Sequence, residues 1–572
     1  MTEKNGLTIF EIKNLLAKFV EDSLLKAKEN KEIEFNVGIL PKILFEQPKD
    51  KKFGDLATNF AIDFARKTKI ASRKIAEIVI VFLKESNIKI ISKIEVAGPG
   101  FLNFFLNYTE LTKVLLDIEN THENYGCLDY FAGKSINVEF VSANPVGPLN
   151  IVNARAAAVG DCLCRLFSKA GYSKVTREYY INDAGNQIKI FGESVAARYK
   201  QALGVDAQFP ENGYQGEYVK DIANWIKETY NDKYLSFSQE EQASILGKLA
   251  SLRIIEEQKS ELKNFGVEFD VWFSEKTLHT VNKVKDTLDL LKTKECVYEK
   301  DNAIWLKTTQ FGDDKDRVLV KENGDWTYFL VDIAYHIDKF KRGFNTLLDI
   351  WGPDHHGHII RMKSAMSSLG IDPSSLVVLI AQQVNLIHEG EVLAMSKRAG
   401  KFITMKELVD EVGADVVKYF FIMKSLDAHF DFDIELAKKH SDENPVYYIQ
   451  YAFARICSIL RNSKESVVAD LSAKNISEVN LVLLKEEEEH ELIFKLASFP
   501  ELILNSAIFY APHWLPKYLE ELASIFHRFY TECKVLSDDK DLTLARLLLV
   551  SSTKTVIKNG LDLMGISTPE KM

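Results

Sequence analysis

The chain has 572 residues, of which 46% are hydrophobic and 27% charged, and its formal net charge is −10. This length predicts several domains, and the composition is that of a globular protein rather than a disordered or fibrous one. No apolar run approaches the roughly 18 residues of a membrane span, and the first residues lack the apolar core of a signal peptide. We therefore expect no membrane contact and a soluble, cytoplasmic protein. The acidic balance still allows an RNA partner, because phosphate contacts need only a local basic track.

The cysteines and histidines do not predict a metal site. The six cysteines are scattered without a Cys-x-x-Cys pair, which is typical of reduced, buried thiols. Three histidines crowd Asp354 in WGPDHHGHIIRMK, which starts at Trp351. Adjacent histidines rarely face the same way on a strand, and no distant ligand pair accompanies them. We expect no structural metal.

The pattern of the chain predicts three domains. Residues 1–110 mix helical and strand-like segments and predict a small α/β module. Over 130–412, the strand candidates INVEFVS, VTREYYIN, TLLDIWG and SLVVLIA alternate with helices, as in a parallel, doubly wound sheet. A mostly helical insertion is expected at about 183–291. Residues 413–572 predict a helical bundle, in which a helix covers 445–460 and the acidic run KEEEEHE from Lys485 forms a solvated helix face.

The most informative stretch is VEFVSANPVGPLNIVNARAAAVGDCLCRLF, which starts at Val138. It predicts a buried strand, a loop with Pro and Gly, and an amphipathic helix that points its N–H groups at an anion. This is the outline of a nucleotide phosphate site. Asn150 either only caps the helix that starts at Ile151 or caps it and also contacts phosphate. Arg155 either serves the phosphates or pairs with a neighbour, and the sequence does not decide between these.

Three further stretches are REYYINDAGNQI from Arg177, AMSKRAGKF from Ala394 and NPVYYIQYAFARICSIL from Asn444. Together with the first, they resemble the arginyl-tRNA synthetases, a family of class I aminoacyl-tRNA synthetases. The resemblance implies an α/β fold: a class I Rossmann-like parallel-sheet catalytic domain, an N-terminal α/β tRNA-recognition module and an all-α anticodon-binding bundle. It also implies L-arginine, ATP with substrate-bound magnesium, and tRNA(Arg) as substrates. We further expect a monomer.

The chain departs from the family's first signature. Where the family has His-x-Gly-His, this chain has Asn150, Ile151, Val152 and Asn153. Asparagine can donate to phosphate oxygens but stays neutral. If the family's histidines are protonated in the transition state, each lost charge costs on the order of 1 kcal/mol. Val152 adds a β-branched side chain where the family's glycine leaves space for adenine. In the second signature, Ala394 replaces a lysine.

By the resemblance, the ATP site takes residues from both signatures and from the loop after TLLDIW. Asn150, Asn153, Ser396 and Lys397 are the catalytic candidates, and Lys397 is expected to clamp pyrophosphate. The expected ATP-binding residues are Pro148, Asn150, Val152, Asn153, Gly352, Asp354, His355, Val384, Met395, Lys397 and Arg398.

A site for a guanidinium needs carboxylates placed for bidentate hydrogen bonds. The resemblance assigns arginine binding to Glu139, Ser142, Asn144, Tyr328, Asp332 and Asp354. Glu139 lies in an otherwise apolar strand, where a carboxylate is costly unless it is paired. Its partner is either the ligand cation or another residue of the chain, and both alternatives stay open.

The resemblance also implies two tRNA-binding surfaces. Phe101 would stack on an unpaired base and Asn103 would bond its edge, in the N-terminal module. Tyr447, Tyr451 and Met572 would face the anticodon stem-loop. Aromatic residues at such spacings also occur in cores, and this alternative remains for Phe101 and both tyrosines.

The expected reaction forms arginyl-adenylate from arginine and ATP and then transfers arginine to the 3′ end of tRNA(Arg), with tRNA needed for the first step. The changed signatures leave one alternative from another class: a catalytically impaired tRNA-binding or regulatory paralogue. A second alternative, an enzyme for a different amino acid, is disfavoured by the paired carboxylates.

Overall fold

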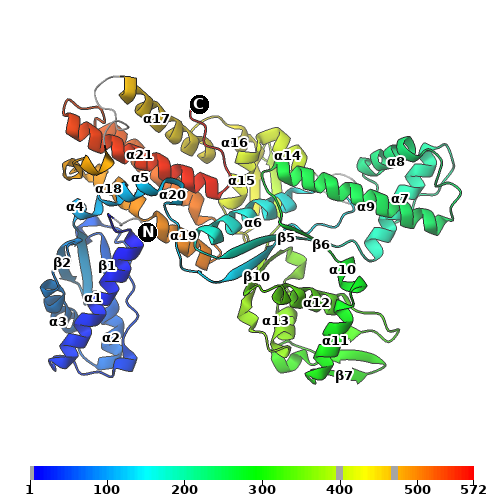
Figure 1. Cartoon of the computed structure of the whole chain (residues 1–572), viewed down its shortest axis with the longest axis horizontal. Helices are drawn as coiled ribbons and strands as arrows, with labels where there is room; N and C mark the ends of the chain where they lie inside the picture. Colours follow the sequence, from blue (N-terminus) through cyan, green and yellow to red (C-terminus); the bar gives the residue numbers. More distant parts are fainter. Residues whose placement is uncertain (1–4, 394–402, 466–474) are drawn as a thin grey trace.

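The computed structural model describes residues 5–393, 403–465 and 475–572. Figure 1 shows an N-terminal module at one end, a central parallel sheet, a helical arm (α7–α9) that projects away from this sheet, and a helical bundle along the top. Within the described residues, no helix is long and apolar enough to cross a membrane.

The N-terminal module is a three-stranded antiparallel sheet with the order β1-β3-β2, accompanied by helices. Helix α1 begins with a capping box in which Thr8 and Glu11 bond each other's backbone N–H groups. The apolar run from Ile75 lies in α3, where Ile75, Val79 and Phe82 are buried. The elements are α1 (Ile9–Glu29), β1 (Leu56–Thr58), α2 (Phe60–Thr68), α3 (Ser72–Glu85), β2 (Ile91–Ala97), β3 (Phe101–Leu106), α4 (Tyr108–Leu111) and α5 (Val114–Thr121).

The central sheet has five parallel strands in the order β11-β10-β4-β5-β6. Four of them fall on the segments that the sequence predicts as strands. The fifth, β6, lies inside the segment expected to be a helical insertion, because the four residues VWFS are too short to give a pattern. The elements are β4 (Ser135–Glu139), α6 (Ile151–Lys169), β5 (Lys174–Ile181), β6 (Val271–Ser274), β10 (Thr346–Trp351) and β11 (Leu376–Ile380).

The helical arm consists of α7 (Asn186–Ala202), α8 (Glu217–Tyr230) and α9 (Gln239–Asn264). Helices α7 and α9 cross at backbone distance through Gly192 and Gly247. A Cβ atom on Gly192 would lie 2.1 Å from the Ala243 carbonyl oxygen, so this crossing requires glycine.

Shorter elements complete the middle of the chain. Strands β7, β8 and β9 form an antiparallel sheet, and β12 pairs with β13 and β14. Strand β14 lies beyond residue 413, where the sequence predicts almost only helices. The elements are α10 (Lys276–Thr280), α11 (Lys283–Thr293), β7 (Val297–Lys300), β8 (Ala303–Leu306), β9 (Arg317–Val320), α12 (Tyr328–Lys341), α13 (His358–Ser368), β12 (Val384–His388), β13 (Glu391–Val392), α14 (Met405–Val412), α15 (Ala414–Ile422), β14 (Phe430–Asp433) and α16 (Ile434–Lys438).

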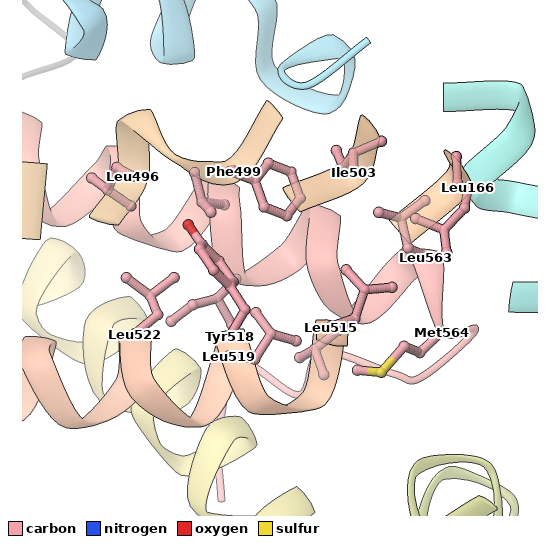
Figure 2. Packing of buried hydrophobic residues seen from close by; sticks show 14 of the residues in the cluster. Leu166, Leu496, Phe499, Ile503, Leu515, Tyr518, Leu519, Leu522, Leu563 and Met564 are labelled. Atoms are coloured by element: carbon pink, nitrogen blue, oxygen red, sulfur yellow. The ribbon is translucent and has the colours of Figure 1, made fainter. Parts of the chain in front are cut away.

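The bundle comprises α17 (Pro445–Glu465), α18 (Glu487–Ala497), α19 (Phe499–Ile508), α20 (Trp514–Glu532) and α21 (Lys540–Leu563). Its apolar core continues into the central domain: Leu166 of α6 belongs to the same buried cluster as Leu515 of α20 and Leu563 of α21, which Figure 2 shows. The acidic run expected as a solvated face is partly buried. Glu489 is fully buried and pairs with Arg546 at 2.7 Å, so the prediction is wrong for this residue.

The segment between the N-terminal module and the central sheet is held by the last helix of the bundle. The Asn559 amide of α21 donates to the carbonyl oxygens of His122, at 2.9 Å, and Tyr125, at 3.3 Å. Ser551 and Ser552 of α21 donate to Glu119 of α5. The carboxyl-terminal bundle therefore contacts the segment that leaves the N-terminal module.

Candidate active site

The candidate site lies at the carboxyl ends of β4 and β10. The chain continues from β4 toward β5 and β6 on one side, whereas β10 and β11 lie on the other. Such a point, where the strand order reverses, is where parallel α/β sheets bind ligands. The first signature follows β4, and the segment with Gly352, Asp354 and His355 follows β10.

The signature turn (Val141–Asn144), which follows β4, has an unusual backbone. Val141 has φ = 70° and Ser142 has φ = 39°. Left-handed φ values are uncommon for residues other than glycine, and a β-branched residue such as Val141 is a clear outlier. The Ser142 hydroxyl donates to Glu139 Oε1 at 3.0 Å and accepts the Tyr180 N–H at 3.1 Å. These bonds hold the turn beside the ends of β4 and β5.

The helical arm also holds the loop between β4 and α6. Tyr218 of α8 donates to the Val146 carbonyl at 2.8 Å, and Gln258 of α9 donates to the Gly147 carbonyl at 3.0 Å. Asn144 donates to Gln187 of α7 at 2.6 Å. Each helix of the arm thus contacts this loop. Pro148, near its end, is partly buried.

Helix α6 begins with a capping box made by the two signature asparagines. Asn150 Oδ1 accepts the N–H groups of Val152, at 2.9 Å, and Asn153, at 3.0 Å, and Asn153 Oδ1 accepts the Asn150 N–H. The N–H groups of Val152 and Asn153 are therefore engaged within the chain. A phosphate contact by Asn150 or Asn153 would use the Nδ2 group, because the Oδ1 atoms already accept the cap hydrogen bonds.

Arg155 is a structural residue. It is fully buried and donates to the carbonyl oxygens of Gln382, Ser425 and Ala428 at 2.7–3.2 Å. It therefore pairs with neighbouring segments, which is one of the two alternatives from the sequence.

A cavity of about 650 Å³ is lined by three of the six residues expected to bind arginine. Tyr328 stands at its mouth with 68% of its surface exposed. One turn along α12, an oxygen of Asp332 lies 3.0 Å from His358 Nε2, in a hydrogen bond whose donor depends on the imidazole tautomer. The expected residues that line this cavity are Tyr328, Asp332, Asp354 and His355.

Glu139 is directed away from this cavity and into the protein. Its Oε2 accepts from Lys339 at 2.6 Å, and its Oε1 accepts from Ser142. Burial raises the pKa of Glu139 against the pull of Lys339. Of the two partners considered for Glu139, the structure contains the one from within the chain.

Other expected ATP-binding residues occupy different environments. Val152 and Gly352 are partly buried, whereas Val384 at the start of β12 is 2% exposed and belongs to the apolar core. Ala394, Met395, Ser396, Lys397 and Arg398 lie outside the described residues.

The expected tRNA-binding residues also differ in how exposed they are. Phe101 is half-buried at the start of β3, and Asn103 is 4% exposed in the middle of this strand. Tyr447 and Tyr451 stack on α17 with ring centroids 6.5 Å apart, and Tyr451 is 42% exposed. Tyr447 and Met572 line one cavity of about 400 Å³.

Three family models match successive parts of the chain. The arginyl tRNA synthetase N terminal domain model matches residues 11–106. The model of the catalytic domain of tRNA synthetases class I (R) matches residues 120–419, more than half of the chain. The DALR anticodon binding domain model matches residues 449–572.

The chain belongs to the arginyl-tRNA synthetase family. The arginine–tRNA ligase of Caldanaerobacter subterraneus subsp. tengcongensis is 48% identical over 556 residues, which cover 97% of this chain and 98% of that protein. The arginine–tRNA ligase of Listeria monocytogenes is 47% identical over 534 residues, 93% of this chain and 95% of that one. The solved Thermus thermophilus arginyl-tRNA synthetase has the same fold, with a TM-score of 0.75 at 20% identity. The match covers 98% of this chain and 100% of that one.

Family membership confirms both the resemblance and the predicted fold class. Of the three acidic residues that line the cavity, one is absent from the sequence predictions. Glu275 follows β6 directly, lines the cavity and accepts a hydrogen bond from Tyr180 at 2.9 Å. Burial raises its pKa. Its position after a parallel strand would have identified it, but β6 lies within the expected helical insertion.

Proposed function

We propose that the protein is an arginine–tRNA ligase, which joins L-arginine to tRNA(Arg) with ATP. The observation that supports this most directly is the cavity of about 650 Å³, which is lined by two carboxylates from different parts of the chain, Asp332 of α12 and Glu275 after β6. A pair of carboxylates matches the planar fork of a guanidinium better than it matches any neutral or acidic side chain of a substrate. Nothing in the chain's similarities favours the impaired paralogue.

In the first step, the carboxylate oxygen of arginine attacks the α-phosphorus of ATP. The bond between this phosphorus and the bridging oxygen breaks, and pyrophosphate leaves with its magnesium ion. In the second step, the 2′-hydroxyl of the terminal adenosine attacks the arginyl carbonyl, its proton is released and AMP leaves. Neither step needs a nucleophile from the enzyme, so the site acts by positioning and by stabilising charge.

The roles of individual residues follow from their places in the site. Asp332 and Glu275 hold the guanidinium, Tyr328 closes over it, and the signature turn with Ser142 and Asn144 orients the α-amino end. The Nδ2 groups of Asn150 and Asn153 donate to phosphate oxygens, while Lys397 supplies the positive charge that these asparagines lack. Asp354 and His355, after β10, line the ribose side.

The remaining expectations are part of the proposal. The cysteines form no disulfide, five of them are buried, and this suits a reducing compartment such as the cytoplasm. Phe101 and Asn103 contact the outer corner of tRNA, and Tyr447, Tyr451 and Met572 contact the anticodon stem-loop. We expect a monomer, which light scattering of the purified protein checks.

Aminoacylation of tRNA(Arg) by the purified protein tests this function, with arginine, lysine and cysteine as separate substrates. We expect charging with arginine alone and ATP–pyrophosphate exchange only when tRNA is present. Glu275→Gln and Asp332→Asn should each raise the KM for arginine about tenfold to a hundredfold, because each removes a charge-assisted hydrogen bond. The KM for ATP should stay within about twofold. Absence of charging by the unmodified protein with every substrate present would contradict the proposal.

A further inference from the structure

Three buried carboxylates lie side by side across the central sheet. Asp349 of β10 is in register with Glu139 of β4, which is in register with Glu178 of β5. Their exposed fractions are 0%, 7% and 0%. Directly opposed residues on neighbouring strands have Cβ atoms only about 5 Å apart, so this row of like charges exists only with strong compensation from another element.

One face of α12 supplies the compensating groups. His336 Nε2 lies 2.7 Å from Asp349 Oδ2, and both nitrogens of the Arg342 fork bond Glu178 at 2.7 and 2.8 Å. Lys339, between them, has no exposed surface. It donates to Glu139 at 2.6 Å and to Asp349 at 2.9 Å. Burial alone would raise the pKa of Asp349, but Lys339 and His336 outweigh it and lower this pKa to about 2, so this carboxylate stays charged.

Glu139 connects this row to the signature turn. One oxygen accepts from Lys339 and the other accepts from Ser142, the residue with φ = 39°. A left-handed turn at Val141 and Ser142 persists only where its surroundings hold it. Ser142 is also held by the Tyr180 N–H, whereas the direction of the Glu139 carboxylate is set by Lys339.

We propose that Lys339 is a positioning residue, which acts through Glu139 to hold the signature turn in its left-handed conformation. The turn carries Ser142 and Asn144, so Lys339 sets the place of the α-amino group of the substrate amino acid without touching it. This proposal rests on the function proposed above. It differs from a role in which the ion pair only stabilises the fold. The proposal requires a tether, the hydrogen bond from Lys339 to Glu139, whereas the stabilising role requires only that the buried charges balance.

The double variant Lys339→Met/Glu139→Gln separates these two roles. It removes one positive and one negative charge and leaves Asp349 paired with His336, so the buried charge stays balanced. The amide introduced at position 139 can still bond Ser142 but is no longer held by the ammonium group of Lys339. We expect a cooperative thermal transition, a KM for arginine in ATP–pyrophosphate exchange raised about tenfold, and a KM for ATP within about twofold. An arginine KM within about twofold of the unmodified enzyme would overturn the proposal.

The single variant Lys339→Met leaves two buried carboxylates without their shared cation and is expected to lose stability. The matched control is Arg342→Met, which lies beside α12 and removes a partner of Glu178, in the same row. Glu178 keeps Tyr335 and Asn137 as donors. The control should lower the melting temperature while the arginine KM stays unchanged. A similar rise in arginine KM in the control would assign the effect to α12 as a whole and overturn the proposal.

A crystal structure of the double variant gives a test that does not depend on activity. We expect Val141 and Ser142 to leave the left-handed region, and retention of both positive φ values would overturn the proposal. Where the unmodified protein neither charges tRNA nor binds arginine in calorimetry, the proposed function fails, while the conformation of the turn still tests the tether.

Discussion

Glu261 of α9 is a titrating residue beside the start of α6. Burial, followed by repulsion from Glu257, raises its pKa to about 7. In the described part of the chain its Oε2 is buried without a hydrogen-bond partner. A raised pKa means that the folded state prefers the protonated carboxyl. The stability from this preference is complete below the unfolded pKa of about 4.3 and is lost as the pH rises through about 7.

Glu261→Gln should therefore flatten the dependence of stability on pH. Between about pH 5 and pH 8, the melting temperature of the unmodified protein should fall by a few degrees relative to that of the variant. Thermal melts followed by circular dichroism across this range measure the difference. Glu256→Gln is the matched control, because Glu256 is exposed on the same helix. Parallel curves for the unmodified protein and Glu261→Gln would contradict the assignment of the pKa.

At the residue scale, the sequence predicted the chemical type of a side chain better than it predicted which residue that side chain contacts. It identified Glu139 as a carboxylate that needs a cation, but Lys339 lies 200 positions away, and only the register of β4, β10 and α12 brings the two together. Glu489 was expected on a solvated face for the same reason: its partner Arg546 belongs to a distant helix. Ion pairs between distant segments leave no local pattern in a sequence.

At the scale of elements, the start of α6 combines a cap with a candidate phosphate contact, and a substitution can separate them. Asn150→Ser keeps a good cap oxygen, so the free energy of unfolding should change by less than about 0.5 kcal/mol. It removes the Nδ2 donor, and kcat/KM for ATP should fall about fivefold to tenfold. Denaturant unfolding and exchange kinetics measure the two effects.

Asn150→Ala is the companion variant, because it loses both the cap oxygen and the donor. It should cost about 1 kcal/mol of stability in addition to the kinetic loss. Unchanged ATP kinetics in the serine variant would leave Asn150 as a helix cap alone, which is the other alternative from the sequence.

Helices and long strands could be predicted from the sequence, whereas short strands could not. The four predicted strand segments matched β4, β5, β10 and β11, and the helix expected over 445–460 lies within α17. Strands β6 and β14 have four residues each. They are strands because a neighbouring strand supplies their hydrogen bonds, and this information is tertiary. Because β6 was not predicted, Glu275, which follows it, was missing from the predicted site.

At the scale of the whole molecule, a substitution of Asn559 tests how the bundle is attached to the rest of the chain. Its amide is 4% exposed and serves two carbonyl groups of the segment after α5. Asn559→Ala leaves these carbonyls with fewer donors, which should cost about 1–3 kcal/mol. We expect an earlier thermal transition and a higher KM for tRNA, with the KM for arginine unchanged. Lys558→Ala, exposed on the same helix, is the control.

The hydrogen bonds from α21 to residues 122–125 have a consequence for proteolysis of the chain. A protease cut at that segment would sever the backbone but leave both fragments clasped through Asn559, Glu119 and the continuous apolar core. A nicked molecule should therefore elute from a sizing column as one particle. Because α21 contacts both α5 and residues 122–125, we expect the distance between the two surfaces proposed to bind tRNA to change little when the RNA binds.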